Sequence, residues 1–361
     1  AGMKPATIRD VASRAEVSVA SVSRVLNGAG PVTESTRQRV LGAVEALKYV
    51  PHSGARSLST SRTDTVGIIL PDLFGEFFSE LIRGMDLAAR QHGLHLIVSS
   101  SHDDADEASA AIRSMRGRVD GMIVLSPHLD AANLAAGLAG STPVLLMNGG
   151  ANDAGRPSIV VDNHGGAVAA VEHLIALGRR HIVHVSGPTG NLEAEARMAG
   201  YLQAMADAGL PTRVMEGDFN QASGHGVMQT ALAAKGPIDA VFTGNDMMAV
   251  GTLLALQEAG VRCPQDVVVV GFDDIPIASL VRPSLSTMRI DIAATGKRAL
   301  DRLAALISAG PNAEPDTACE TIRPVLVTRE SSRTETLHHP IADGPARPAT
   351  QPLPQGDHQD V

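Results

Sequence analysis

The sequence predicts two parts of different fold class, an all-α head at the N-terminus and a larger α/β body made of two lobes. In residues 7–27, apolar residues recur at helical spacing in two short runs separated by a turn. From Thr65 onward, short apolar strands alternate with amphipathic helices, and the strands fall into two successive sets. A small helical domain followed by two sheets, each covered by helices, accounts for the 361 residues.

The head is expected to contain three helices. Thr7 and Asp10 have the spacing of a capping box, so Thr7 begins the first helix. Ser18 and Thr33 can cap a second and a third helix. The second helix would present small and basic side chains at its exposed start. Two helices crossed over a tight turn in this way are typical of the helix-turn-helix that reads DNA.

The body is expected to contain two parallel sheets. The predicted strands are 66–70, 94–100, 122–125, 144–147 and 159–161, then 182–185, 214–217, 240–243 and 267–271. The helices between them include 78–92, 166–177, 193–208, 222–234 and 247–259. Most of these helices are followed by the usual stop residue, at Gly93, Gly178, Gly209 and Gly260. Continuous apolar strands with crossover helices predict sheets covered on both faces, and two such sheets predict a cleft between two lobes.

The charge is distributed unevenly along the chain. The formal net charge is −9, which by itself argues against a nucleic-acid partner. Residues 1–62, however, hold nine Lys and Arg against four Asp and Glu, a net charge of +5. The remaining 21 basic and 35 acidic residues give −14. A basic head on an acidic body fits a DNA-binding module attached to a regulatory domain.

The composition excludes several other classes of protein. No run of about 18 uninterrupted apolar residues is present, so no membrane span is expected. The N-terminus lacks an apolar export signal, and Cys263 and Cys319 are far apart, so a cytoplasmic location with reduced thiols is expected. There is no nucleophile elbow, zinc-protease motif or phosphate loop, and no cofactor or metal is expected. For His181 and His184, a structural role is favoured over metal binding.

Further segments extend the helix-turn-helix signal along the chain. They are Tyr49-Val50-Pro51-His52-Ser53-Gly54-Ala55-Arg56-Ser57-Leu58, Val66-Gly67-Ile68-Ile69-Leu70-Pro71-Asp72, Val270-Gly271-Phe272-Asp273-Asp274 and Pro283-Ser284-Leu285-Ser286-Thr287. With these segments in this order, the chain resembles the lactose/galactose repressor (LacI/GalR) family over about residues 6–332. The resemblance implies a body like that of the periplasmic binding proteins and a ligand-responsive, sequence-specific regulator of transcription, usually a repressor of genes for carbohydrate use.

The resemblance also implies domain boundaries and an oligomeric state. The head would span residues 6–50, a hinge 51–63 and the two-lobed body 64–332. The first lobe would comprise 64–161 and 293–320, and the second 162–292 and 321–332. Residues 333–361 are rich in Pro, Gly and Gln and are expected to be disordered. They lack the leucine heptads that tetrameric members append, so a homodimer on a pseudo-palindromic double-stranded operator is expected.

In this family, the two residues that open the second helix face base edges, and here they are Val19 and Ala20. Their methyl groups suit thymine methyl groups, and Arg24 can bind guanine or a phosphate. Leu58 matches the hinge side chain that enters the minor groove. The alternatives are plain helix surface and a plain linker, and Asn27 fits the end of the helix better than base reading. The residues assigned to DNA are Thr7, Ser18, Val19, Ala20, Ser21, Ser23, Arg24, Asn27, Ala55, Arg56 and Leu58.

The effector cleft is the third implied site. Phe78 would stack on a small, sugar-like ligand from the first lobe. Its hydrogen-bonding partners would be Asn148, Arg197, Asn245 and Asp273, whose polar groups suit hydroxyls. The alternatives are an internal ion pair for Arg197 and Asp273, and a helix cap for the Asn245-Asp246 pair, with Asp246 as the capping residue. A periplasmic-type sugar-binding protein and a sugar-modifying enzyme remain competing functions.

Overall fold

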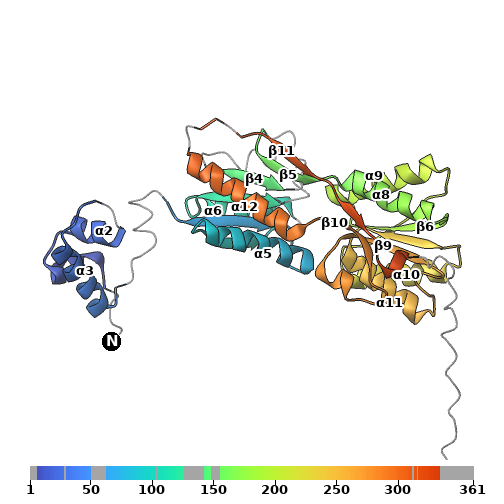
Figure 1. Cartoon of the computed structure of the whole chain (residues 1–361), viewed down its shortest axis with the longest axis horizontal. Coiled ribbons are helices and arrows are strands. Elements are labelled where there is room, and N and C mark those ends of the chain that lie inside the picture. The colour runs from blue at the N-terminus through green and yellow to red at the C-terminus, as the bar shows by residue number, and fades with distance from the viewer. Residues whose placement is uncertain are drawn as a thin grey trace, which may run out of the picture.

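The computed structural model describes residues 6–27, 30–49, 62–102, 104–125, 142–147, 155–310, 313–314 and 316–333. The hinge residues Ala55, Arg56 and Leu58, the cleft residue Asn148 and the tail from residue 334 lie outside this part of the chain. The described residues form a helical head and an α/β body with two sheets, which confirms the predicted fold class (Figure 1).

The head consists of α1 (Ile8–Ala15), α2 (Val19–Asn27) and α3 (Glu34–Leu47). Thr7 caps α1 in a complete capping box, and Thr33 caps α3. Glu16 ends α1 with a left-handed backbone, φ 52°, which turns the chain sharply toward α2. The three helices share a small apolar core, made by Val11, Ala12, Ala15, Val22, Val25, Val40, Ala43 and Tyr49.

The first lobe is built on a parallel sheet with the strand order β11-β5-β4-β3-β1-β2. Its strands are β1 (Thr65–Leu70), β2 (His95–Ser100), β3 (Gly121–Leu125), β4 (Val144–Met147), β5 (Ser158–Val161) and β11 (Cys319–Ile322). Its helices are α5 (Glu76–Gln91), α6 (Ala105–Met115) and α12 (Ile292–Ala309). β3 and β4 are buried along their whole length, as strands covered on both faces should be.

The second lobe repeats this plan with the strand order β12-β10-β9-β8-β6-β7. Its strands are β6 (Ile182–Ser186), β7 (Arg213–Glu216), β8 (Ala240–Thr243), β9 (Val268–Asp273), β10 (Ser286–Arg289) and β12 (Val325–Val327). Its helices are α8 (Asn163–Ala176), α9 (Leu192–Asp207), α10 (Gln221–Ala233) and α11 (Asp246–Glu258). The sheet is parallel as expected except at one edge, where β12 returns from the first lobe and runs antiparallel to β10.

The chain passes between the lobes three times, after β5, after β10 and between β11 and β12. As a result, the late helix α12 packs beside the early helix α5 in the first lobe (Figure 1). Their backbones touch, because a Cβ built on Gly84 would lie 1.9 Å from the carbonyl oxygen of Ala293. Likewise, a Cβ on Gly296 would lie 2.3 Å from the carbonyl oxygen of Leu81. Two glycines therefore make this close helix contact possible.

The predicted stop residues behave as expected. Gly93, Gly178, Gly209 and Gly260 all have positive φ, between 64° and 79°. This left-handed conformation ends a helix at little cost when the residue is glycine. Each of these turns leads the chain toward the start of the next strand. Within the described ranges, no helix combines the length and the hydrophobicity that crossing a bilayer requires.

Candidate functional site

The start of α2 lies on the surface of the head and is exposed to solvent. Val19 is 42% exposed, and Ala20 and Arg24 are also exposed. By contrast, Val22 and Val25 on the opposite face are buried in the core. The three residues that the sequence singled out for base and phosphate contacts are therefore accessible to a partner.

Two serines at this surface also build the helix. The Ser18 hydroxyl accepts a hydrogen bond from the backbone N–H of Ser21 at 3.1 Å, and the two hydroxyl oxygens are 3.0 Å apart. The Thr7 backbone N–H and hydroxyl donate to the Asp10 carboxylate at 2.8 and 2.7 Å. These hydrogen bonds stabilise the starts of α1 and α2. The contacts of Thr7, Ser18 and Ser21 with DNA stay predictions.

Ser23 is half-buried on α2, and Asn27 is the last residue of that helix, as expected. The residue-by-residue assignment left out three exposed arginines of the head, Arg9, Arg14 and Arg39. The concentration of basic residues in the head was the signal that could have identified them, since exposed guanidinium groups bind phosphates in any sequence.

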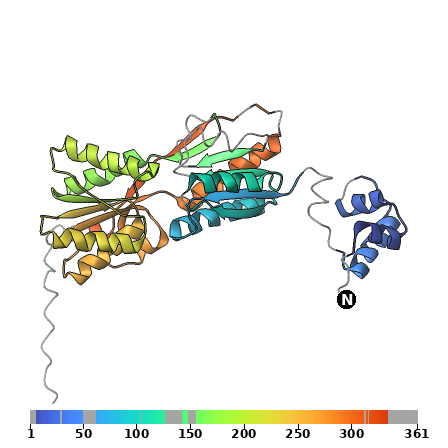
Figure 2. The same cartoon turned by 180° about the vertical axis from the view of Figure 1, so that it is seen from behind.

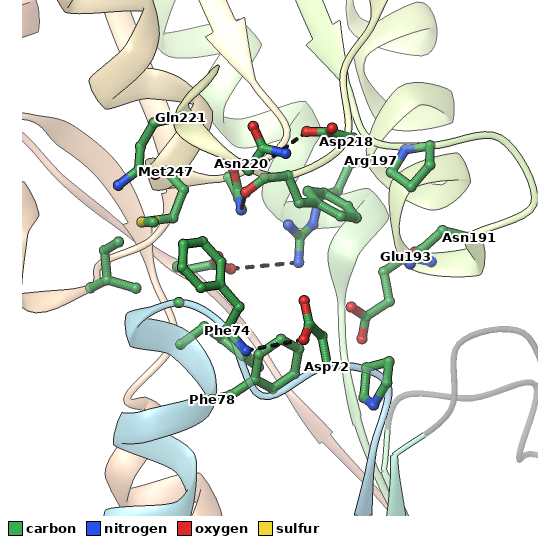
Figure 3. A pocket seen from close by; sticks show the side chains of 18 of the residues that line it. Asp72, Phe74, Phe78, Asn191, Glu193, Arg197, Asp218, Asn220, Gln221 and Met247 are labelled. Atoms are coloured by element: carbon green, nitrogen blue, oxygen red, sulfur yellow. Dashed lines mark hydrogen bonds and ion pairs between the residues drawn. The ribbon is translucent and has the colours of Figure 1, made fainter. Parts of the chain in front are cut away.

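The second candidate site is a cleft of about 420 Å³ between the two lobes. Its lining comes from the first lobe at Asp72, Phe74, Phe77 and Phe78 and from the second lobe at Glu193, Arg197, Asp218, Phe219, Asn245 and Asp273, among others. These residues lie in or just after strands β1, β6, β7, β8 and β9, at the start of the helices that follow. Ligands of parallel α/β sheets bind at this carboxyl edge. Figure 3 shows Phe74 extending toward Met247 of the second lobe, with Phe78 beside Asp72 of the first lobe.

The structure brings together four of the five predicted cleft residues, Phe78, Arg197, Asn245 and Asp273. The fifth, Asn148, lies outside the described residues. Their contacts with a ligand stay predictions. Sequence reasoning missed several polar lining residues, which are Asp72, Asn191, Glu193, Asp218, Asn220 and Gln221.

Arg197 is buried and bonded on several sides. Its Nε donates to the side-chain oxygen of Asn163 at 2.8 Å, and its Nη1 donates to the carbonyl oxygen of Gly244. The guanidinium carbon lies 4.0 Å from the centre of the Phe272 ring, in a cation–π contact. Its Nη2 is 3.6 Å from Asp273 Oδ1, which is an ion pair but too long for a hydrogen bond. The position of Arg197 is therefore set before any ligand arrives.

Asp273 has a buried carboxylate in the cleft. It is 4% exposed, and its Oδ1 has no hydrogen-bond partner among the described residues. Burial raises the pKa of Asp273 to about 7; the charge of Arg197 opposes the increase and that of Glu193 adds to it. A buried carboxylate oxygen with an unused acceptor position is a natural partner for a ligand that donates a hydrogen bond.

The backbone turn that orients Asp273 is stabilised by the interactions of the next residue, Asp274. Asp273 and Asp274 have φ values of 111° and 61°, which are unfavourable for residues other than glycine. Asp274 accepts from Arg289 Nε at 2.6 Å and pairs with Arg329 Nη2 at 2.7 Å. Arg289 ends β10 and Arg329 follows β12, so the two ion pairs connect this turn to strands that lead to and from the first lobe.

The expectation that Asp246 caps α11 is wrong. Asn245 is the cap, because its side-chain oxygen accepts from the N–H of Met248 at 3.0 Å, and its amide donates to the carbonyl of Phe219 at 2.9 Å. Asp246 is the first helical residue and is fully buried. It accepts from the Thr287 hydroxyl at 2.6 Å and from the N–H of Ile275 at 3.0 Å. Burial and the nearby charge of Asp273 raise the pKa of Asp246 well above its usual range.

His184 has the environment of a core residue. It is fully buried, and its ring stacks against Tyr201 and Phe242 at centroid distances of 5.1 and 4.9 Å. Burial lowers its pKa to about 4, so the ring is neutral at physiological pH. The described residues contain no group of three or more side chains able to hold a metal ion.

Comparison with known proteins identifies both parts of the chain. Residues 7–52 match the bacterial regulatory proteins of the lacI family, and residues 171–332 match a periplasmic binding protein-like domain. Catabolite control protein A of Priestia megaterium is 34% identical over 304 residues, which cover 82% of this chain and 92% of that protein. The transcriptional repressor PurR of Erwinia tasmaniensis is 33% identical over 349 residues, 95% of this chain and 98% of that protein.

Among solved structures, the lac repressor dimer bound to operator and the anti-inducer ONPF has a TM-score of 0.81 at 29% identity. The match covers 92% of this chain and all of the repressor chain. Two of these relatives are named as repressors, PurR and the lac repressor. The chain belongs to the lacI family of bacterial regulatory proteins.

Proposed function

We propose that this protein is a repressor of carbohydrate-use genes that binds a pseudo-palindromic operator as a homodimer and responds to a small molecule held between its lobes. The observation that carries this proposal is the combination, in one chain, of an exposed α2 start with a cleft whose walls come from both lobes. A ligand that contacts both walls changes the separation of the lobes. The hinge joins the head to the first lobe, so lobe movement can reach the DNA contacts.

Support for DNA binding comes from the exposed residues of α2 and the basic residues of the head. We expect Val19→Tyr to change the preferred operator, because contacts with base edges determine specificity. Arg24→Ala should weaken binding to all operators by about ten-fold, and wild-type affinity should fall steeply with salt. Gel-shift assays and selection from randomised DNA measure these effects. Arg90→Ala, which removes an exposed arginine from the body, is the matched control. An unchanged consensus for Val19→Tyr would refute the assignment.

Support for a dimer comes from exposed leucines in α5, in α11 and shortly after β9. Leu87 on α5, Leu254 on α11 and Leu280 just after Pro276–Ser279 are 49%, 49% and 72% exposed. Figures 1 and 2 both place α5 and α11 along the same edge, whereas α9 lies on the opposite side of the second lobe. Exposed apolar side chains on helices that share an edge are typical of an interface between subunits.

Leu254→Asp combined with Leu280→Asp should therefore convert the protein to a monomer. Operator affinity should then fall by roughly 100-fold or more, because each head would bind a half-site alone. Analytical ultracentrifugation and gel shifts measure the two effects. Leu202→Asp on α9 is the control and should remain dimeric. A double variant that sediments as the wild type does would rule out this interface.

A further inference from the structure

The charge of the cleft indicates which effectors it can accept. Four acidic side chains line it, Asp72, Glu193, Asp218 and Asp273, whereas Arg197 is the one cationic side chain among its described lining residues. A negatively charged ligand would therefore meet an excess of like charge in a partly closed space, where screening by water is weaker than on an open surface.

Arg197 offers little to an anion. Sites for phosphate and carboxylate use guanidinium groups with two parallel donors available. Here Nε and Nη1 are bonded to Asn163 and Gly244, and Nη2 faces Asp273. The flat face of the group rests on Phe272. An anion could therefore use only the remaining N–H groups of Nη1 and Nη2, and it would meet the carboxylate of Asp273 beside Nη2.

Three of the helix N-termini around the cleft are already capped by asparagine side chains. Such termini attract anions through their unbonded N–H groups. Asn191 accepts from the N–H groups of Glu193 and Ala194 at 3.0 Å each, which caps α9. Asn220 caps α10 by accepting from Ser223 at 2.9 Å, and Asn245 caps α11. At these three termini, N–H groups that could bind a phosphate are therefore already paired with the protein's own oxygens, whereas α5 begins after Gly75 without a side-chain cap.

The same cleft does offer acceptors. Asp273 Oδ1 is buried, lines the cleft and has no hydrogen-bond partner in the described part of the chain. Leaving a buried acceptor unpaired is unfavourable, and a hydroxyl or ammonium group of a ligand would correct this. Hydrogen-bond donors on the ligand thus match the group that the protein leaves unsatisfied.

The cleft also offers its ligand an apolar face. Of the six phenylalanines in the chain, four line the cleft, Phe74, Phe77, Phe78 and Phe219. Phe77 and Phe78 meet edge to face, with centroids 5.3 Å apart, and Phe74 is 64% exposed. Aromatic faces bind the C–H surface of a sugar ring and also attract cations. The volume of about 420 Å³ suits a small ring compound.

We infer that the effector carries no negative charge and is a hydroxyl- or amine-bearing ring compound, and that this cleft rejects phosphorylated and carboxylated sugars. The inference rests on the proposed function, because it specifies the ligand of the same cleft. The cleft is thus expected to bind uncharged and amino sugars, which share donor groups and an apolar ring face. It is expected to reject anionic sugars with the same ring.

The test uses ligands that differ only in charge. Glucose, glucosamine, glucose 6-phosphate and glucuronate form one series, and ribose with ribose 5-phosphate forms another; lactose and cellobiose extend the neutral arm. Binding to the full-length protein is measured by calorimetry and thermal shift, and operator affinity is measured with each ligand present. At least one neutral or amine-bearing member should bind and change operator affinity, and its anionic counterpart should bind at least 100-fold more weakly.

A variant shows whether charge causes the discrimination. Asp72→Asn combined with Asp218→Asn removes two carboxylates at the exposed rim of the cleft and should reduce the discrimination against the anionic member about ten-fold. Asp266→Asn is the matched control, because it removes an exposed carboxylate of the second lobe that pairs with Arg262 away from the cleft. Its discrimination should equal that of the wild type.

Preferred binding of an anionic member would overturn the inference, and so would a protein that binds no member of either series. Equal discrimination in the wild type and the rim double variant would overturn the role of the carboxylates. Release of operator by a sugar phosphate would reject this inference and leave the proposed function standing. Failure to bind any operator would reject the proposed function, while calorimetry would still report the ligand class.

Discussion

Replacing Asp273 with asparagine should abolish the response to the effector and should also make the protein more stable above pH 7. The buried carboxylate faces Arg197 and Glu193 and lies close to Asp246, and its pKa in the folded protein is about 7, compared with 3.8 for an unperturbed group. Because the folded-state pKa is raised, folding favours the protonated form. The wild type therefore loses stability as the pH rises from about 4 through 7, by about 4 kcal/mol for a shift of this size.

Asp273→Asn removes this dependence, so its melting temperature should exceed that of the wild type at pH 8 and approach it near pH 5. Operator binding without effector should change by less than about two-fold, since the residue lies in the body and not in the head. Thermal melts across pH 5–8 and operator titrations with a sugar from the test series that binds the wild type measure both effects. Asp266→Asn is the control, because a pKa lowered to about 2 predicts a constant difference over this range. Parallel pH profiles for Asp273→Asn and the wild type would contradict the prediction, as would a retained effector response.

Gly84→Ala should destabilise the first lobe severely. The added Cβ would lie 1.9 Å from the carbonyl oxygen of Ala293 and 2.7 Å from its carbonyl carbon. These are backbone atoms of α12, so no side-chain rotation can relieve the clash, and the two helices must move apart. We expect a loss of about 3 kcal/mol, or roughly 6–12 °C in melting temperature. Calorimetry of the full chain measures it.

The same substitution at Gly226 provides the control. Gly226 lies on α10 of the second lobe, and a Cβ there would meet no heavy atom within 4 Å. Gly226→Ala should therefore stabilise the protein by up to about 1 kcal/mol, because alanine favours helix more than glycine does. If Gly84→Ala lowers the stability of the protein and Gly226→Ala raises it, the loss at Gly84 comes from the close packing of the two helices and not from the helix propensity of alanine. Equal effects at the two positions would exclude the backbone contact between α5 and α12.

Much of the fold could be predicted because most of its elements carry local signals. The apolar runs that form β4 and β8 match the expected ranges, and the third head helix begins after its threonine cap as expected. The edge strands β11 and β12 were not predicted. Their residues are exposed or half-buried, so they lack the continuous apolar run that identifies a central strand.

The cleft was harder to predict in detail. Phe78, Arg197, Asn245 and Asp273 were assigned through family motifs, and the fold places them together. The exchange of roles between Asn245 and Asp246 could not be predicted, because both residue types favour helix starts and only tertiary contacts with Thr287 and Ile275 decide between them. The positive φ at Asp273 likewise depends on Arg289 and Arg329, which are remote in sequence.

The three passages between the lobes have a consequence for biosynthesis. A chain leaves the ribosome from its N-terminus, so β6 to β10 are complete before α12 is made. The second lobe can then assemble almost all of its sheet while α5 still lacks the helix that covers it. Until residues 292–309 emerge, buried α5 residues such as Leu81 and Met85 stay exposed on the nascent chain. The lobe whose synthesis begins first therefore stays incomplete until near the end of the chain, which gives chaperones a long time to act on it.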